Sequence, residues 1–189
     1  LYYIDGLTLT QNTKFIGHGN AEFRLDPGAT SGLTIDGSIS VGFENMTLTF
    51  DSYGLLETSS TAETTQLVFD NCTIESNVIH SKLIKFAQSC GLTLFRDCDI
   101  TVYHDGTGGD YSYLIGSPSG VYSVYPVFID NDITLSDVNY CYLSHQLSWD
   151  KSGVSTEAGV IKGGRIIDCR TLFNGIASSS YNRPDIIAV

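Results

Sequence analysis

Hydrophobic residues in this chain fall into short runs that alternate with polar residues, and one such arrangement recurs. Each copy has an apolar run, then Asn or Asp, then a small or apolar residue, and then a polar residue before a second apolar run. The copies are residues 41–48, 67–74, 93–100 and 127–133. Alternation with a period of two predicts β-strands, and recurrence at a regular interval predicts an array of stacked repeats.

A polar marker in each copy defines the interval. The markers are Asn45, Asn71, Asp97 and Asn131, at successive intervals of 26, 26 and 34 along the chain. Because Asn and Asp tolerate the left-handed backbone conformation and bond to their own backbone, we expect all four to be corners between strands. Stacked side-chain amides at such corners are expected to pair as a ladder.

A second, apolar column supports the same repeat. It consists of Leu55-Leu56, Leu83-Ile84, Leu114-Ile115 and Leu143, at successive intervals of 28, 31 and 29 along the chain. The two columns together predict an all-β fold, a right-handed single-stranded parallel β-helix (β-solenoid) of about 6 coils. Equivalent strands of adjacent coils would lie about 4.8 Å apart, so like residues should stack. The expected stacks are Phe43, Phe69 and Phe95, and Cys72 on Cys98.

The two ends of the chain continue the pattern less regularly. Alternating runs at 1–4, 6–9, 15–17, 22–25 and 32–35 predict further strands before the first marker. Beyond residue 143, either 166–169 continues the corner column at an interval of 37, or Gly164 does so at an interval of 33. We favour the second register because it places 172–173 in the leucine column, at an interval of 29 from Leu143.

These boundaries define one domain. We predict a parallel β-helix over residues 1–177, excised from a longer chain, and an exit segment or linker over 178–189. The Ser run and Arg183-Pro184 near the end are typical of a segment that leaves the regular coils.

Composition and charge narrow the possible partners. Apolar residues make up 42% of the chain, charged residues 16%, and the net charge is −11. Phosphate backbones and anionic lipid surfaces both need a basic protein surface, so we expect no nucleic-acid or membrane-surface partner. No apolar run approaches the roughly 18 residues that span a bilayer, so no membrane insertion is expected. A neutral partner such as a glycan or a protein is compatible with this charge.

The cysteines predict neither a disulfide framework nor a metal site. The five are Cys72, Cys90, Cys98, Cys141 and Cys169, an odd number without a CxxC pair. We interpret them as buried free thiols that behave as small hydrophobic residues, which favours folding in a reducing compartment. No metal and no cofactor is expected.

The repeated rungs resemble a known superfamily. Residues 43–48, 69–74 and 95–100 share Phe, any residue, Asn or Asp, Cys or Met, Thr or Asp, and then Ile or Leu. With many Ser, Thr, Asn and Gly residues, this resembles the pectate-lyase-like parallel β-helix proteins, above all phage tailspike or receptor-binding proteins. The resemblance implies a homotrimer that binds, and often cleaves, a bacterial surface polysaccharide. It also implies a place in the virion tail or outside the cell, after folding in the host cytoplasm.

Insertions between the regular coils are the expected location of the functional site. The longest are at 103–113, 117–125 and 148–157. They supply carboxylates, which glycosidases use in pairs, and aromatic rings, which stack on sugars. The predicted catalytic residues are Asp105, Asp110, Asp150 and Glu157. The predicted substrate-binding residues are Tyr103, Tyr111, Tyr113 and Trp149.

These features predict recognition of a bacterial surface polysaccharide by part of a phage tailspike or tail fibre. Two alternatives stay open. A polysaccharide depolymerase, either a glycoside hydrolase or a lyase, would release oligosaccharides through the four carboxylates. A structural shaft or adhesin module would bind no glycan, and replacing Tyr111 or Trp149 with Ala would change nothing.

Overall fold

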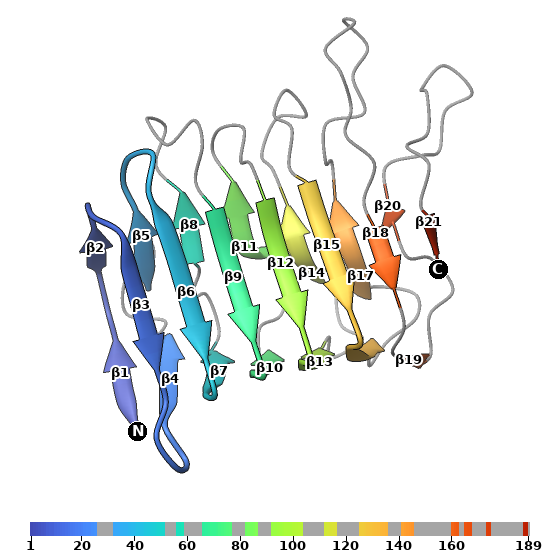
Figure 1. The fold of residues 1–189 in the computed structure, drawn as a ribbon, viewed down its shortest axis with the longest axis horizontal. Coiled ribbons are helices and arrows are strands. Elements are labelled where there is room, and N and C mark those ends of the chain that lie inside the picture. Colours follow the sequence, from blue (N-terminus) through green and yellow to red (C-terminus); the bar gives the residue numbers. More distant parts are fainter. Residues whose placement is uncertain are drawn as a thin grey trace, which may run out of the picture.

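A computed structural model gives the course of the chain (Figure 1). It describes residues 1–25, 32–51, 56–58, 66–76, 82–86, 92–103, 112–116, 125–135, 141–145, 160–162, 165–167, 173–174 and 187–188. Within these ranges every regular element is a β-strand. Accordingly, the described part of the chain contains no helix of the length and apolarity needed to cross a bilayer.

The strands form three parallel sheets. Sheet A holds β1 (Tyr2–Ile4), β4 (Glu22–Leu25), β7 (Thr47–Phe50), β10 (Thr73–Ser76), β13 (Asp99–Val102), β16 (Asp132–Leu135) and β19 (Arg165–Ile167). Sheet B holds β2 (Leu7–Leu9), β5 (Leu33–Ile35), β8 (Leu56–Thr58), β11 (Lys82–Phe86), β14 (Ser112–Gly116), β17 (Cys141–His145) and β20 (Phe173–Asn174). Sheet C holds β3 (Thr13–Ile16), β6 (Ser40–Glu44), β9 (Gln66–Asp70), β12 (Leu92–Arg96), β15 (Tyr125–Ile129), β18 (Val160–Lys162) and β21 (Ile187–Ala188).

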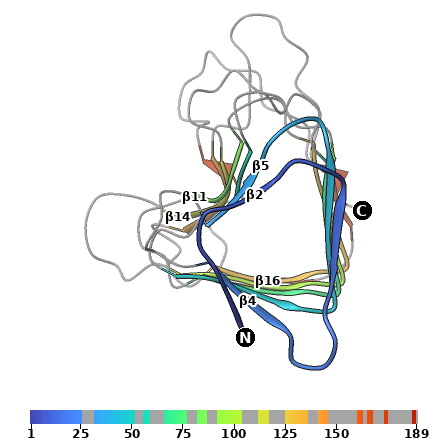
Figure 2. The ribbon, with the colours of Figure 1, turned by 90° about the vertical axis from the view of Figure 1, so that its left-hand side faces the viewer.

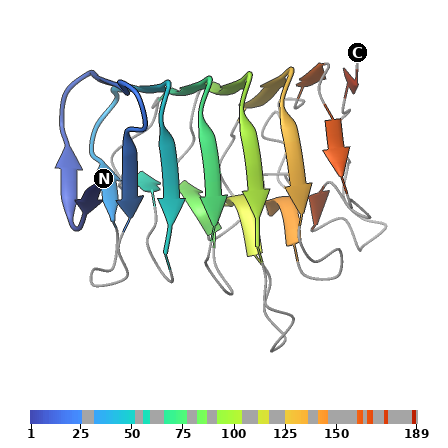
Figure 3. The ribbon, with the colours of Figure 1, turned by 90° about the horizontal axis from the view of Figure 1, so that it is seen from below.

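Each strand pairs with the strand three places further along the chain, which is the topology of a parallel β-helix. Along the long axis the three sheets form the sides of a triangle (Figure 2), and from below the strands stack side by side (Figure 3). Each sheet has seven strands in the described part, and six steps between coils agree with the predicted number. β21 pairs with β18, although it lies within the range expected for an exit segment.

A column of phenylalanine rings fills the corner of the core next to sheet C. Phe15, Phe43, Phe69, Phe95 and Phe128 stack with centroid separations of 5.3, 5.2, 4.8 and 4.8 Å. Successive rings lie within 14° of parallel, and the last three pairs within 8°. The predicted stack of three is therefore confirmed and extends by one ring at each end. The separation follows the distance of about 4.8 Å between parallel strands.

The apolar column in sheet B also has the predicted register. Ile84 pairs with Leu56 on one side and with Ile115 on the other. At the C-terminal end Ser144 pairs with Phe173, and Val127 pairs with Val160. These pairs confirm the favoured register, because Val160 and Phe173 continue sheets C and B at the intervals that it requires.

The corner between sheets C and A is a single left-handed residue. Asn45, Asn71 and Asp97 have φ values of 56°, 50° and 51°, as predicted. The fourth corner is Asp130, with a φ of 53°, so the prediction that Asn131 is a corner was wrong by one position. From Phe43 onward the corner lies two residues after the stacked phenylalanine, and Phe128 places it at 130. Both residues favour turns, so residue type alone did not distinguish them.

Asn131 instead lies inside the helix, in the column of the buried cysteines. Its side-chain Nδ2 donates to the Phe95 carbonyl at 3.0 Å, and its Oδ1 accepts from the Cys98 backbone N–H at 2.9 Å. The thiols of Cys72 and Cys98 donate to the carbonyls of Phe43 and Phe69 at 3.4 and 3.5 Å. The position after the corner thus satisfies the phenylalanine carbonyl of the previous coil, and the buried free thiols predicted at 72 and 98 are confirmed. The side chains of the other three cysteines lie outside the described residues.

The exposed corner column changes from amides to acids along the axis. Asn71 Nδ2 donates to Asn45 Oδ1 at 2.7 Å, which confirms the predicted ladder for this pair. Asp97 continues the column, and its backbone N–H donates to the Ile129 carbonyl of the next coil, so it lies directly beside Asp130. Both side chains are exposed. Two carboxylates in neighbouring coils repel each other, and neither can donate to the other when ionised.

We expect Asp97→Asn to stabilise the protein slightly, by about 0.5 kcal/mol. Asn tolerates the same left-handed conformation, extends the amide ladder, and removes one of the two repelling charges. Urea unfolding at low salt measures the change, and the gain should shrink in about 1 M NaCl because salt screens exposed charges. Asp97→Glu is the control that keeps the charge. An equal gain from that variant, or a loss from Asp97→Asn, contradicts the interpretation.

Candidate functional site

Most of the predicted site residues lie outside the described residues. These are Asp105, Asp110, Asp150, Glu157, Tyr111 and Trp149. Tyr113 belongs to β14, but its side chain is not among those described. Tyr103 follows β13, is 43% exposed, and donates its backbone N–H to Ser76 Oγ at 3.2 Å.

Strand order shows where the two candidate insertions are attached. Residues 104–111 connect β13 of sheet A with β14 of sheet B. Residues 146–159 connect β17 of sheet B with β18 of sheet C. The predicted acids therefore belong to connections that attach to opposite ends of the strands of sheet B.

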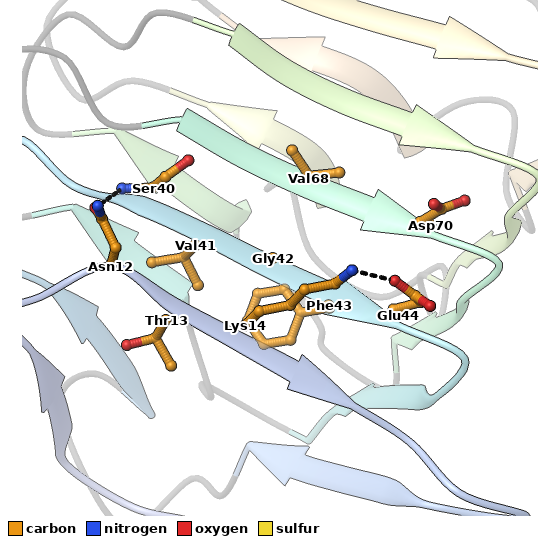
Figure 4. Close-up of a pocket in the computed structure, with 10 residues that line it drawn as sticks. All are labelled: Asn12, Thr13, Lys14, Ser40, Val41, Gly42, Phe43, Glu44, Val68 and Asp70. Atoms are coloured by element: carbon orange, nitrogen blue, oxygen red, sulfur yellow. Dashed lines mark hydrogen bonds and ion pairs between the residues drawn. The ribbon is translucent and has the colours of Figure 1, made fainter.

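Among the described residues, the outer face of sheet C carries a groove of about 390 Å³ (Figure 4). It lies across β3, β6 and β9, the first three strands of this sheet. Side chains alternate along each strand, so Phe43 points into the core whereas Gly42 and Glu44 belong to the outer face. The sheet is continuous beneath the groove, and its backbone hydrogen bonds keep the lining in place.

Gly42 produces the hollow. It lies in register between Lys14 and Val68, both of which carry side chains on the outer face. A Cβ at this position would lie 3.4 Å from Lys14 Cγ, so the Lys14 stem forms one wall of the hollow, in contact with any side chain placed at residue 42. Figure 4 shows the Lys14 ammonium directed along β6 toward Glu44.

Polar groups border the groove at both ends. At one end the Ser40 backbone N–H donates to Asn12 Oδ1 at 2.9 Å. At the other end Lys14 and Glu44 form an ion pair. Next to this pair Asp70 accepts two hydrogen bonds from Arg96, one of them from Nε at 3.0 Å. The groove thus combines an apolar floor with amide, ammonium and carboxylate groups, a mixture typical of small-ligand sites.

The Asp70 carboxylate is held in its ionised form. Hydrogen bonding from Arg96, which is stronger than the opposing effect of burial, lowers the pKa of Asp70 from its usual value. Its charge also attracts Lys14, which lowers the pKa further. This carboxylate is therefore an acceptor for donor groups of a ligand at neutral pH, and it has no proton to give.

Besides the corner pair Asp97 and Asp130, two pairs of carboxylates among the described residues lie one coil apart. Glu44 pairs in register with Asp70 in sheet C, and Asp99 pairs with Asp132 in sheet A. A separation of one coil, about 4.8 Å, is close to that of retaining glycosidases. Hydrolysis also needs a general acid with a raised pKa, whereas Asp70 has a lowered one. The pair in the groove is consequently better suited to binding than to acid catalysis.

The sequence contains a signal for this groove that sequence reasoning missed. Aligned copies of the repeat place Gly42, Val68 and Leu94 at one outward position. The glycine stands out as the member without a side chain. The groove lies on the regular coils, whereas the site was expected on the insertions.

A second depression, of about 560 Å³, lies at the N-terminal end of the core. Leu1, Tyr2 and Ile16 border it and are 58%, 62% and 51% exposed. Phe15 and Phe23 form its inner wall. Its lining is mostly apolar and offers few groups that could orient a polar ligand.

No metal site is evident in the described part of the chain, where no three His, Cys, Asp or Glu side chains are grouped closely enough to hold an ion. Comparison with protein families, with curated proteins and with solved structures gives no match.

Proposed function

We propose that this protein recognises a bacterial surface polysaccharide through the outer face of sheet C, as part of a phage tailspike or tail fibre. The groove over Gly42 is the observation that supports this proposal most directly. Sugars present hydroxyl groups and apolar ring faces, and the groove presents carboxylates and an amide around an apolar floor. Because these groups project from paired strands, the site is held in shape before the ligand arrives.

An apolar track beyond the groove favours a polymer as ligand. Val68, Leu94 and Val127 are register partners on the outer face of sheet C, and all three are partly exposed. They continue the column of Gly42 along the axis of the helix. A polysaccharide that follows this column would place successive sugar rings against successive coils, with its hydroxyl groups toward Glu44, Asp70 and Arg96.

Charge narrows the ligand class. The chain has a net charge of −11, which repels anionic polymers over the range of the Debye length. Within the site, Lys14 and Arg96 are engaged by Glu44 and Asp70. A neutral polysaccharide, whose hydroxyl groups donate to these carboxylates, is the best match. The homotrimeric state implied by the resemblance to tailspikes stays a prediction.

We expect Gly42→Leu to reduce glycan binding at least tenfold. The new side chain fills the hollow beside the Lys14 stem, whose Cγ lies 3.4 Å from a Cβ built at this position, and leaves no room there for a sugar. Binding is first found by screening the 189-residue protein against a glycan array that includes bacterial capsular and O-antigen polysaccharides. The affinity for the best ligand is then measured by calorimetry.

Thr101→Leu is the control, since it places the same leucine side chain on the outer face of sheet A. It should leave the affinity unchanged. Tyr111→Ala and Trp149→Ala test the insertions instead. If these two variants lose binding while Gly42→Leu retains it, the site is on the insertions and the proposed location is wrong. If no glycan binds, the structural shaft becomes the better account.

The same ligand decides the enzymatic alternative. Incubation of the polysaccharide with the protein, followed by chromatography of the products, reveals oligosaccharides if the protein is a depolymerase. In that case Asp110→Asn, Asp150→Asn and the other two insertion acids are tested first, followed by Glu44→Gln. Binding without product release supports recognition alone.

A further inference from the structure

Two buried thiols occupy equivalent positions in neighbouring coils. Cys72 and Cys98 are each 2% exposed and neither forms a disulfide. The residues that flank them are register partners, Asp70 with Arg96 and Thr73 with Asp99. The two backbones are thus about 4.8 Å apart, which lies within the Cα separation of about 4.4–6.8 Å found for disulfides.

The two sulfur atoms also interact. A hydrogen bond with Cys98 lowers the pKa of Cys72 to about 7, against the opposing effect of burial. The same hydrogen bond, together with burial, raises the pKa of Cys98. The pair therefore loses its first proton from Cys72, and the Cys98 thiol, which donates to the Phe69 carbonyl while both groups are protonated, then donates to the Cys72 thiolate instead. A thiolate with a neighbouring thiol is the arrangement in which oxidation leads to a disulfide.

We propose that Cys72 and Cys98 form an oxidation site, which closes as a disulfide between adjacent coils when a peroxide reaches it. The Cys72 thiolate attacks one peroxide oxygen, the O–O bond breaks, and sulfenic acid and water form once a proton is taken up. The Cys98 sulfur then attacks the sulfenic sulfur and displaces a second water. Two thiols lose two protons and two electrons, and hydrogen peroxide is reduced to two water molecules.

The location of the pair determines its effect. Both residues follow the left-handed corner, and their carbonyls accept hydrogen bonds from the backbone N–H groups of Asp99 and Asp132 in the next coil, which holds the two backbones in register. The disulfide would join equivalent positions of successive repeats and tie the third coil to the fourth. The disulfide would close a loop from residue 72 to residue 98 and so restrict the unfolded chain, which raises the free energy of unfolding. This inference is independent of the proposed glycan site.

The experiment exposes the reduced full-length protein to hydrogen peroxide and maps its peptides without reduction. We expect a linked peptide containing Cys72 and Cys98, lighter by two hydrogen atoms than the two thiol peptides. The melting temperature should rise by about 5 °C or more, and dithiothreitol should reverse the rise. In Cys98→Ser, dimedone should label Cys72, because the sulfenic acid then has no partner. In Cys72→Ser, neither link nor label should form at Cys98.

Three results would overturn the proposal. The first is oxidation of Cys90, Cys141 or Cys169 without any linked peptide. The second is dimedone labelling of Cys98 in Cys72→Ser that equals the labelling of Cys72 in Cys98→Ser. The third is a disulfide that lowers the melting temperature. Cys72→Ala and Cys98→Ala serve as second variants if either Ser variant fails to fold, since Ala adds no polar group to the core.

Discussion

Phe69→Ala should destabilise the protein by about 3–5 kcal/mol, as for other buried phenylalanines. The ring is fully buried and stacks on Phe43 at 5.2 Å and on Phe95 at 4.8 Å, so its removal opens a cavity and ends two ring contacts. Each aromatic pair contributes about 0.5–1.5 kcal/mol beyond the area that it buries. A domain is stable by only about 5–15 kcal/mol, so this variant should unfold at a much lower urea concentration.

Neighbouring residues provide the controls for this expectation. Val68→Ala alters the same strand on its outer face and should cost less than about 1 kcal/mol. Phe15→Ala alters the first ring of the stack, which is only partly buried and has a stacked ring on one side. Coils of a solenoid interact mainly with their neighbours, so the end of the stack should matter less than its middle. A cost for Phe15→Ala equal to that for Phe69→Ala would contradict the role given to the stack.

The regular part of the fold could be predicted from the sequence because packing imposes it. Inward residues of adjacent coils lie directly above one another in the core, so the same type of side chain is favoured at each level. Phe43, Phe69 and Phe95 therefore recur once per coil. The same constraint explains the leucine column of sheet B. Where the interval changes, at the fourth copy, the alignment failed by one residue, because Asp130 and Asn131 both suit a corner. The position of Phe128 would have decided between them.

The candidate site was less predictable for a different reason. The interval of the repeat shows which residues stack on one another. Outward residues stack without a core that would restrict their type, so one outward column contains Gly42, Val68 and Leu94. The number of strands in each coil was also hidden in the interval. Because the interval does not reveal that each coil has three strands, the sequence could not show that residues 104–111 and 146–159 attach to opposite ends of the strands of sheet B.

The second large loss of stability is expected at residue 131, which lies in the core, whereas the left-handed corner is residue 130. Asn131→Ala should cost about 2–4 kcal/mol, because it leaves the Cys98 backbone N–H and the Phe95 carbonyl without side-chain partners in the core. Asn131→Cys should cost less, since a thiol at the equivalent position, Cys98, donates to the carbonyl of Phe69. Urea unfolding of the three proteins measures both values.

Glycine variants separate the buried role from the corner role. If residue 131 were the left-handed corner, Asn131→Gly would be nearly neutral, because glycine adopts positive φ without steric cost. Inside the core it should instead cost at least as much as Asn131→Ala. Asp130→Gly should be nearly neutral, whereas Asp130→Val should cost about 1–2 kcal/mol through left-handed strain at a φ of 53°. The reverse order, with Asn131→Gly tolerated and Asp130→Gly costly, would place the corner at residue 131 after all.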